Sequence, residues 1–186
     1  MKSKIAEAVG LRYAPVAVLT ADSKPENALQ FKKGKWGCVM FMFANAARGK
    51  STAFDRETYG CWGGGVGLGF GNTYLHFPGG VDCFTYFLSS GNIRWEKGKQ
   101  VGKALESAAG KEFAENFLHG EGYVKRPELV EQWLRELPIT EITSAYVLFK
   151  PLAEVDLDIE KPETVVFLAN PDQLSALVIL ANYGRE

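Results

Sequence analysis

The fold is decided first by the stretch "SAYVLFKPL", residues 144–152. This β-branched and aromatic run ends at Pro151, a residue that cannot donate to a sheet ladder, so it predicts a strand. The short apolar runs "PVAVLT" (15–20) and "ETVVFLA" (163–169) predict two more strands. A fourth run, "WGCVMFMF" (36–43), also has the length of a strand.

Helical patterns lie between these runs. Apolar residues recur at helical spacing over 97–118, Pro127 suits the first turn of a helix over 127–137, and Asn170-Pro171-Asp172 carries helix-start signals before "QLSALVILANYG". Three other stretches are predicted as a helix (50–59), a glycine-rich loop (60–72) and one or two short strands (74–92). Interleaved strands and helices predict an α/β or α+β fold: one domain over residues 1–186, with a mixed β-sheet and helices packed on it.

Composition narrows the range of functions. The 186 residues are 46% hydrophobic, and 21 Lys and Arg balance 22 Asp and Glu for a net charge of −1. Without a basic stripe, binding to nucleic acid or to an anionic membrane is not expected. No signal peptide or membrane span is evident, and three cysteines do not suggest a secreted disulfide framework, so the predicted location is the cytoplasm.

The stretch "MFANAARGKSTAFD" (42–55) contains a relaxed phosphate-loop signature, which runs from Ala44 to Ser51. Its loop has no internal glycine, and no later strand clearly ends in an aspartate for magnesium. A solvated basic turn and a simple anion site at Arg48 and Lys50 are therefore weighed beside nucleotide-phosphate binding at Gly49-Lys50-Ser51.

The cysteines and the glycine-rich stretch supply a second candidate site. No register of the stretch fits G-x-G-x-x-G, and the cysteines lack C-x-x-C spacing. Cys61 opens the glycine loop, where its sulfur would be accessible as a metal ligand, a cofactor ligand or a reactive thiol. Cys38 lies in the apolar run and is a second candidate ligand, whereas Cys83 is the weakest of the three.

The two histidines do not form a metal-binding pair with each other. His76 lies between aromatic residues and is predicted to be a core residue. His119 follows a helical pattern and is predicted to lie at a helix C-terminus, where it favours the dipole. A dyad of Cys61 with either histidine is left open.

The run from Cys38, the block "ARGKSTAFDRETYGCWGGGVGLGFG" and the motif "NPDQLSALVILANYG" together resemble the uncharacterised ArCR family of bacteria and archaea, a domain of unknown function. The resemblance covers most of the chain from "RYAPVAVLT" onward. It implies a shared site around residues 38 to 71 and names no reaction. Family members commonly continue past this point with a further cysteine, so we expect either a short member or a chain that lacks a C-terminal part.

The leading hypothesis is a protein that binds a small anionic or metal-containing cofactor, with an associated redox role. Cys38 and Cys61 would ligate the metal, and an iron-containing cofactor is one candidate. The other expected cofactor-binding residues are Arg48, Lys50, Asp55, Arg56, Glu57, Gly63, Gly64, Gly65, Asn170 and Gln173.

Three alternatives stay open beside that hypothesis, and none of them fixes a reaction. The first is a thiol-dependent enzyme that uses Cys61 as its catalytic residue. The second is a non-catalytic homodimeric module in which the glycine loop and "FTYFLSS" (84–90) form the interface. The third is nucleotide-phosphate binding. Whether the protein is an enzyme is therefore left undecided.

Overall fold

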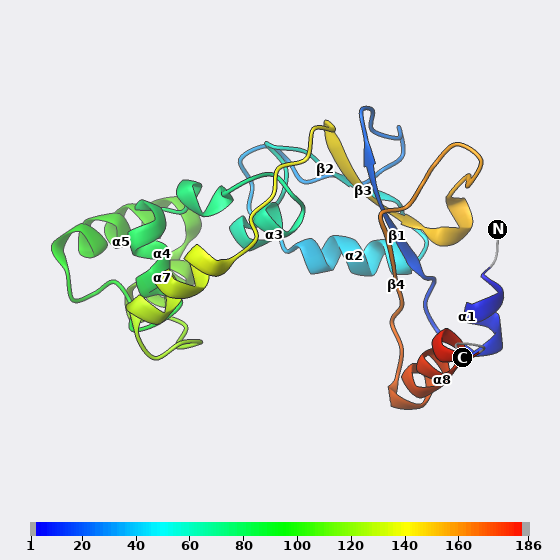
Figure 1. Ribbon diagram of the computed structural model, residues 1–186. Helices are drawn as coiled ribbons and strands as arrows, with labels where there is room; N and C mark the ends of the chain where they lie inside the picture. The colour runs from blue at the N-terminus through cyan, green and yellow to red at the C-terminus, as the bar shows by residue number, and fades with distance from the viewer. Residues whose placement is uncertain (1–2, 184–186) are drawn as a thin grey trace. The chain divides into compact units, whose positions relative to one another are not determined.

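The computed structural model describes residues 3–183, which form two compact units (Figure 1). The first unit takes in the residues up to Gly64 together with those from Thr143 onward, and the second is Gly65–Ile142. The first unit contains the β-sheet, and the second is built from helices. A single domain over the whole chain stays a prediction.

The sheet has four strands in the order β2-β3-β1-β4. They are β1 (Val16–Ala21), β2 (Thr52–Phe54), β3 (Tyr146–Pro151) and β4 (Thr164–Val166). All three ladders are antiparallel, and a parallel bridge joins Leu29 to Thr52 at the outer edge of β2. The two long strands, β1 and β3, therefore form the centre of the sheet, and the two short strands form its edges.

The helices fall into two groups. In the first unit these are α1 (Lys4–Ala8), α2 (Val39–Ala47), α8 (Pro171–Asn182) and the 3₁₀ turn η2 (Leu152–Glu154). In the second unit these are η1 (Thr73–His76), α4 (Gly80–Phe87), α5 (Glu96–Ala109), α6 (Lys111–His119) and α7 (Pro127–Glu136). The short helix α3 (Trp62–Gly67) contains the residue at which the two units divide. The predicted fold class, a sheet with helices packed on it, is confirmed.

The core of the first unit lies on both faces of the sheet. On one face, the ring of Phe149 packs against Phe43 of α2 at 5.9 Å and against Phe54 of β2 at 4.9 Å, centroid to centroid. The other face is covered by a separate apolar cluster: Ala17, Leu19, Ala28, Ala53, Leu148 and Val155. The contact between Phe43 and Phe149 thus positions α2 on the sheet, and with it the N-terminus of this helix.

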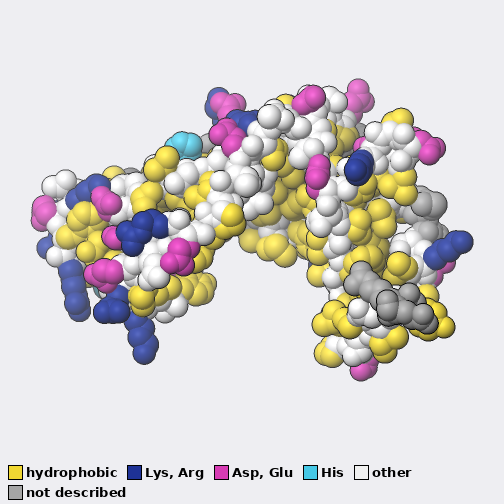
Figure 2. All heavy atoms as spheres, viewed as in Figure 1, with side chains coloured by type: hydrophobic (Ala, Val, Ile, Leu, Met, Phe, Trp, Pro, Cys, Tyr) yellow, Lys and Arg dark blue, Asp and Glu magenta, His cyan; other side chains and the backbone are white. Residues whose placement is uncertain are grey.

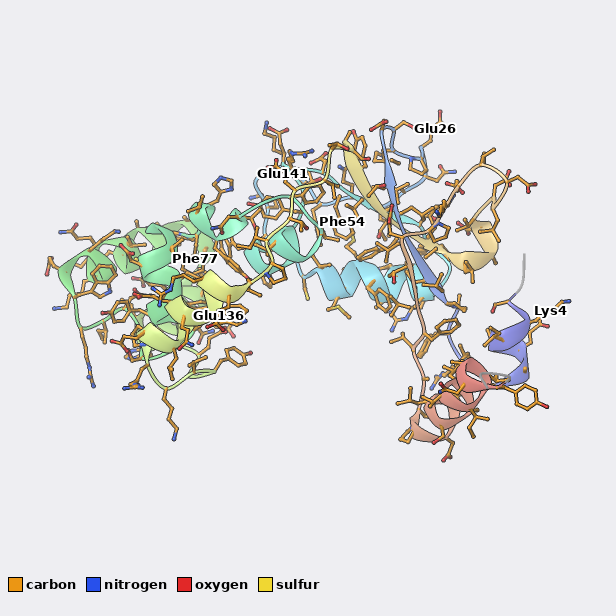
Figure 3. All side chains as sticks on the ribbon, viewed as in Figure 1. Lys4, Glu26, Phe54, Phe77, Glu136 and Glu141 are labelled. Atoms are coloured by element: carbon orange, nitrogen blue, oxygen red, sulfur yellow. The ribbon has the colours of Figure 1, made fainter. Side chains whose placement is uncertain are left out.

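The core of the second unit is a group of aromatic rings on which α4 and α6 converge. Phe77 lies 5.1 Å from Phe84, 5.2 Å from Phe87 and 6.1 Å from Phe117, centroid to centroid. Figure 3 shows Phe77 among the side chains of these helices and Phe54 among those of the sheet. Each unit therefore has an apolar core of its own.

Two predictions around residue 50 were wrong. The run 36–43 was expected as a strand, but Val39–Ala47 is the helix α2. Periodicity cannot separate a short buried strand from a buried helix, and the run continues into the helix formers Ala44, Ala46 and Ala47. The stretch 50–59 was expected as a helix, but Thr52–Phe54 pairs with β3, so tertiary pairing overrides its local preference.

Two other predictions, for residues 60–92, were wrong in part or in full. The glycine-rich stretch was expected to be a loop throughout, but Trp62–Gly67 forms α3. The stretch 74–92 was expected as strands, but it forms η1 and α4. Phe84 and Phe87 are both buried in α4, and their three-residue spacing places them on one helical face.

The remaining elements agree with the sequence. The strands β1, β3 and β4 are present, and α7 begins with Pro127 at its first position. Gly110 divides the predicted helix over 97–118 into α5 and α6. Helix α8 begins with a capping box at Asn170, while Gly184 at its predicted end lies outside the described residues. Among residues 3–183, no helix has the length and apolar character needed to cross a membrane.

A partly buried ion pair makes the first unit sensitive to acid. Lys150 Nζ lies 2.6 Å from Glu160 Oε2, which also accepts a 3.0 Å hydrogen bond from the Asp156 N–H. Burial raises the pKa of Glu160, but the hydrogen bonds from Lys150 and Asp156 and the charge of Lys150 outweigh it and hold that pKa below its ordinary value of 4.5. The carboxylate therefore stabilises the fold above that value.

We expect Glu160→Gln to lower the free energy of unfolding at pH 7 by about 1 kcal/mol, because the charge–charge attraction is lost. In the wild type this contribution is present above pH 4.5 and disappears as the pH falls through the lower folded pKa, so the two proteins converge in acid. Urea denaturation at a series of pH values measures this. The exposed Glu163→Gln is the control, and an equal difference between wild type and Glu160→Gln at all pH values would contradict the assignment.

Candidate functional site

Two glycine–cysteine pairs, Gly37-Cys38 and Gly60-Cys61, meet on the ring of Phe31. A Cβ atom added to Gly37 would lie 2.2 Å from Phe31 Cε1, and one added to Gly60 would lie 2.6 Å from Phe31 Cε2. The Gly60 position would also lie 2.5 Å from the carbonyl oxygen of Gly37. The two main chains therefore touch each other and opposite edges of one ring. This contact brings together the two segments that carry Cys38 and Cys61, which are distant in sequence.

Gly64 lies between Cys61, of the Gly60-Cys61 pair, and the start of helix α2. Its N–H donates a 3.3 Å hydrogen bond to Cys61 Sγ. A Cβ atom at Gly64 would lie 2.2 Å from Val39 Cγ2 and 3.0 Å from Cys61 Sγ, so only glycine admits this approach. The Cys61 thiol and the first residue of α2 therefore lie against the same glycine.

Cys38 is the N-cap residue of α2. It is exposed, its backbone is extended (φ −79°, ψ 122°), and its side chain makes no capping hydrogen bond. The N-terminus of a helix carries a partial positive charge, which stabilises a thiolate placed there. Cys61 is half-buried, so both sulfurs of the pair lie at or near the surface.

A polar turn after β2 supports the Phe31 segment. The Asp55 carboxylate accepts hydrogen bonds from Gln30 Nε2 at 2.9 Å, the Thr58 hydroxyl at 2.8 Å and the Glu57 N–H at 2.8 Å. Gln30 directly precedes Phe31, so the turn positions the ring on which the two cysteine segments meet. Asp55 was predicted to bind a cofactor, and the structure gives it a positioning contact with this segment.

Burial and charge separate the environments of Cys61 and Cys83. Burial raises the pKa of Tyr59, and the charge of the neighbouring Cys61 raises it further. Burial also raises the pKa of Cys83. The charge of Lys97 lowers this pKa and the charge of Asp82 raises it, but burial is the largest effect. Cys83 is fully buried in α4 of the second unit, and its raised pKa favours the neutral thiol.

The predicted phosphate loop has a different geometry from a nucleotide site. Arg48 is the C-cap of α2, and Gly49, Lys50 and Ser51 follow it, so the loop meets the carbonyl end of a helix rather than its N–H end. Ser51 donates a 2.9 Å hydrogen bond to Glu154. Helix α2 separates Arg48 from Cys38 by about 15 Å. Arg48 and Lys50 are therefore not brought to the two cysteines.

Arg56 and Glu57 make contacts within the first unit. Arg56 Nη1 donates a 3.1 Å hydrogen bond to the carbonyl oxygen of Ser144, just before β3. Glu57 pairs with Lys33, which lies two residues beyond Phe31. Both side chains are exposed and connect the turn after β2 to neighbouring segments.

Asn170 and Gln173 are occupied elsewhere. Asn170 Oδ1 accepts from the Gln173 N–H at 2.9 Å, and Gln173 Oε1 accepts from the Asn170 N–H at 3.0 Å. Gln173 Nε2 also donates to the carbonyl oxygen of Gly10 at 2.7 Å, which fastens α8 to the segment after α1. These bonds cap a helix, and the structure does not bring either side chain into contact with the cysteine pair.

The other candidates divide between the units. Gly63 is exposed at the start of α3, whereas Gly65 is buried in the second unit. The prediction that His76 lies in the core was wrong, because it is exposed at the end of η1. His119 lies in the last turn of α6, as predicted.

The segment "FTYFLSS" is part of the core of the second unit rather than an exposed surface. Phe84, Thr85, Phe87 and Ser89 are all buried, and the Ser89 hydroxyl donates to the Thr85 carbonyl oxygen at 2.7 Å. An interface through this segment would therefore require the core of the unit to open.

Each of the two segments that meet on Phe31 carries one thiol, Cys38 or Cys61, as a candidate metal ligand. Among the described residues, no group of three or more His, Cys, Asp and Glu side chains is placed to hold a metal ion. Two protein thiolates leave coordination positions that a metal must fill with other ligands. The arrangement therefore fits a group that brings ligands of its own better than it fits a bare ion.

Gln30, Phe31, Gly37 and Gly60 were missed as parts of the site. The repeated Gly-Cys dipeptide at 37–38 and 60–61 is a sequence signal that could have linked the two segments. Nothing local marks Gln30 or Phe31, because their role depends on contacts with Asp55 and Gly60, which lie more than twenty positions away.

Comparison with known proteins gives a family and no activity. A family model described as "Uncharacterised ArCR", domain of unknown function 169, matches residues 4–186. No curated protein and no solved structure matches the chain. The match covers nearly the whole chain, and any function must be argued from the residues themselves.

Proposed function

The chain belongs to the uncharacterised ArCR family, and from its own residues we propose that it binds a small metal-containing cofactor through the thiolates of Cys38 and Cys61. The observation that supports this proposal is the contact of Gly37 with Gly60 on Phe31, which brings together the segments in which the two cysteines follow. A cytoplasmic location, where thiols stay reduced, belongs to the same proposal.

Each part of the site has a role in this proposal. The start of α2 places its partial positive charge beside Cys38, and the Gly64 N–H donates a hydrogen bond to Cys61 Sγ. Thiolates select Cu(I), zinc and iron–sulfur clusters, and an iron-containing group would give the site a redox role. Asp55 acts at a distance, because it positions the Phe31 segment through Gln30.

The surroundings of Cys38 favour a cofactor with an apolar body. Trp36, Met40 and Phe41 are 64%, 61% and 62% exposed, which is unusual for such large apolar side chains within six residues of sequence. Phe41 lies three residues after Cys38, on the same side of the first turn of α2. A planar or apolar ligand held by the sulfurs would cover part of this surface.

The proposal is tested by the metal content and visible absorption of protein purified without oxygen. We expect near-stoichiometric metal with thiolate-to-metal absorption in the wild type, and its loss in Cys38→Ser and Cys61→Ser, because each variant removes one of two protein ligands. Cys83→Ser is the matched control and should keep the metal, since Cys83 is buried in the second unit. Full occupancy in Cys61→Ser, or a metal-free wild type, would overturn the proposal.

A second function is favoured by the hydrogen bond from the Gly64 N–H to Cys61 Sγ. A half-buried sulfur that accepts this hydrogen bond, in a segment that meets the segment of a second cysteine, suits nucleophilic or thiol-exchange chemistry. In this case Cys61 would be alkylated stoichiometrically by iodoacetamide at neutral pH in metal-free protein. Labelling of Cys61 no faster than that of a free cysteine would exclude this function.

A further inference from the structure

The helix α8 (Pro171–Asn182) is apolar on nearly every side and has no covering partner among the described residues. Leu174, Val178, Ile179 and Leu180 are 56%, 53%, 66% and 50% exposed, and none of the helix residues is buried. Figure 2 shows hydrophobic side chains gathered over this helix. A helix that is hydrophobic all round is normally found buried, so this one is expected to have a partner.

The strand β4 (Thr164–Val166), which precedes α8, is equally unprotected. It is an edge strand that pairs with β1 through Val16–Val18. Residues 164–169 carry no charge and no proline, the features that usually prevent an edge strand from pairing. Val166 and Leu168 are 36% and 38% exposed. The apolar edge therefore continues directly into the apolar helix.

The chain as a whole exposes more surface than compact bodies of its size would expose. The chain exposes 11832 Å². Two separate compact bodies of the sizes of the two units would expose about 10,600 Å², and one compact body of the same mass about 8,900 Å². A standard protein–protein interface covers about 800 Å² on each partner. The excess over two separate bodies, summed over the whole chain, is about 1,200 Å², which is of the size of such an interface.

The charge of the surface formed by β4 and α8 indicates which kind of partner can bind it. Asp172 is the single charged residue between Thr164 and Tyr183. A helix that lies on an anionic membrane surface needs Lys or Arg on its polar face, and a nucleic acid needs a basic patch. An uncharged apolar surface instead fits another apolar protein surface. The edge of β4 in a second copy of the chain is such a surface, because antiparallel pairing about a twofold axis is self-complementary.

We propose that the surface formed by β4 and α8 binds a second copy of this chain in a twofold-symmetric dimer. This surface is defined by Val166, Leu168, Leu174, Val178, Ile179 and Leu180. In the dimer, the β4 edges pair antiparallel and extend the sheet across the axis, while the α8 helices exchange apolar contacts. The proposal does not depend on the cysteine site.

The test is the mass in solution, measured by light scattering on reduced protein. We expect the wild type at twice its 20.5 kDa and Ile179→Glu at the monomer mass, because a charge would be buried in the interface. Ile159→Glu is the matched control: Ile159 is 81% exposed but lies outside β4 and α8, so this variant should stay dimeric.

A second variant, Leu168→Lys on the edge after β4, separates dissociation from unfolding. Both variants should keep the circular dichroism spectrum of the wild type, since neither residue is buried in the chain itself. If Ile179→Glu unfolds, the mass of Leu168→Lys decides. A monomeric wild type, a dimer that survives both substitutions, or binding of the wild type to anionic vesicles as a monomer would each overturn the proposal.

Discussion

Replacing Gly60 by alanine is expected to lower the free energy of unfolding by about 3 kcal/mol and to separate the two cysteines. Gly60 has φ +84°, a conformation that costs an L-residue about 1–2 kcal/mol. The new methyl group would also lie 2.5 Å from the carbonyl oxygen of Gly37 and 2.6 Å from the Phe31 ring. The backbone cannot relieve this overlap without moving Cys61 away from Cys38. Urea denaturation and metal content of the same sample measure both effects.

Gly34→Ala is the matched control for this prediction. Gly34 lies in the same loop as Phe31 and has φ +70°, but an added Cβ atom would have no neighbour within 4 Å. It should therefore show only the conformational cost of about 1–2 kcal/mol and keep full metal content. If Gly60→Ala is no less stable than Gly34→Ala, or if it binds metal as the wild type does, the close approach of the two segments is wrong.

Replacing Asn92 by alanine is expected to destabilise the second unit by about 3–5 kcal/mol. Asn92 is fully buried, and its Nδ2 donates 3.0 Å hydrogen bonds to the carbonyl oxygens of Cys83 in α4 and Phe117 in α6. Its Oδ1 accepts a 3.0 Å hydrogen bond from Trp95 Nε1 at the start of α5. One side chain thus bonds to polar groups of three helices, and its loss removes all three bonds, leaving the Phe117 carbonyl oxygen only the Asn92 N–H.

Trp95 provides a local signal for this measurement, because its indole N–H loses its acceptor in Asn92→Ala. Tryptophan fluorescence during urea denaturation should show a lower midpoint. The exposed Asn116→Ala on α6 is the control and should lie within about 0.5 kcal/mol of the wild type. A loss of less than about 1 kcal/mol in Asn92→Ala would show that the amide does not hold the three helices together.

How much of the fold the sequence predicts depends on the kind of signal. Where a proline marks one end of a helix or strand, as Pro151 does for β3 and Pro127 does for α7, the type of element and that end were predicted correctly. Where an apolar run has no such residue, as in Cys38–Phe43, strand and helix were confused, because every position is apolar and periodicity cannot separate the two. The three-residue strand β2 has no local signature at all, since its pairing with β3 comes from residues nearly one hundred positions later.

The sequence predicted the two cysteines of the candidate site, but it did not predict the contacts that bring their segments together. Cys61 and Cys38 were chosen because of their surroundings in sequence, and the structure brings their segments together. Arg48 and Lys50 were expected beside them, but this expectation assumed that the run before Arg48 is a strand. Because that run is helix α2, its length carries both cations to the opposite end. Asn170 was correct as a helix start, and it forms the capping box of α8 with Gln173.

The central claim is that Cys38 and Cys61 form one site, and capture of a trivalent arsenical tests it most directly. Phenylarsine oxide forms a stable ring only with two thiols close enough to bind one arsenic atom, and releases water. Intact mass spectrometry of reduced, metal-free protein should show one adduct in the wild type and in Cys83→Ser. It should show none in Cys38→Ser or in Cys61→Ser. A wild type without the adduct, or a Cys61→Ser variant that still forms it, would contradict the account.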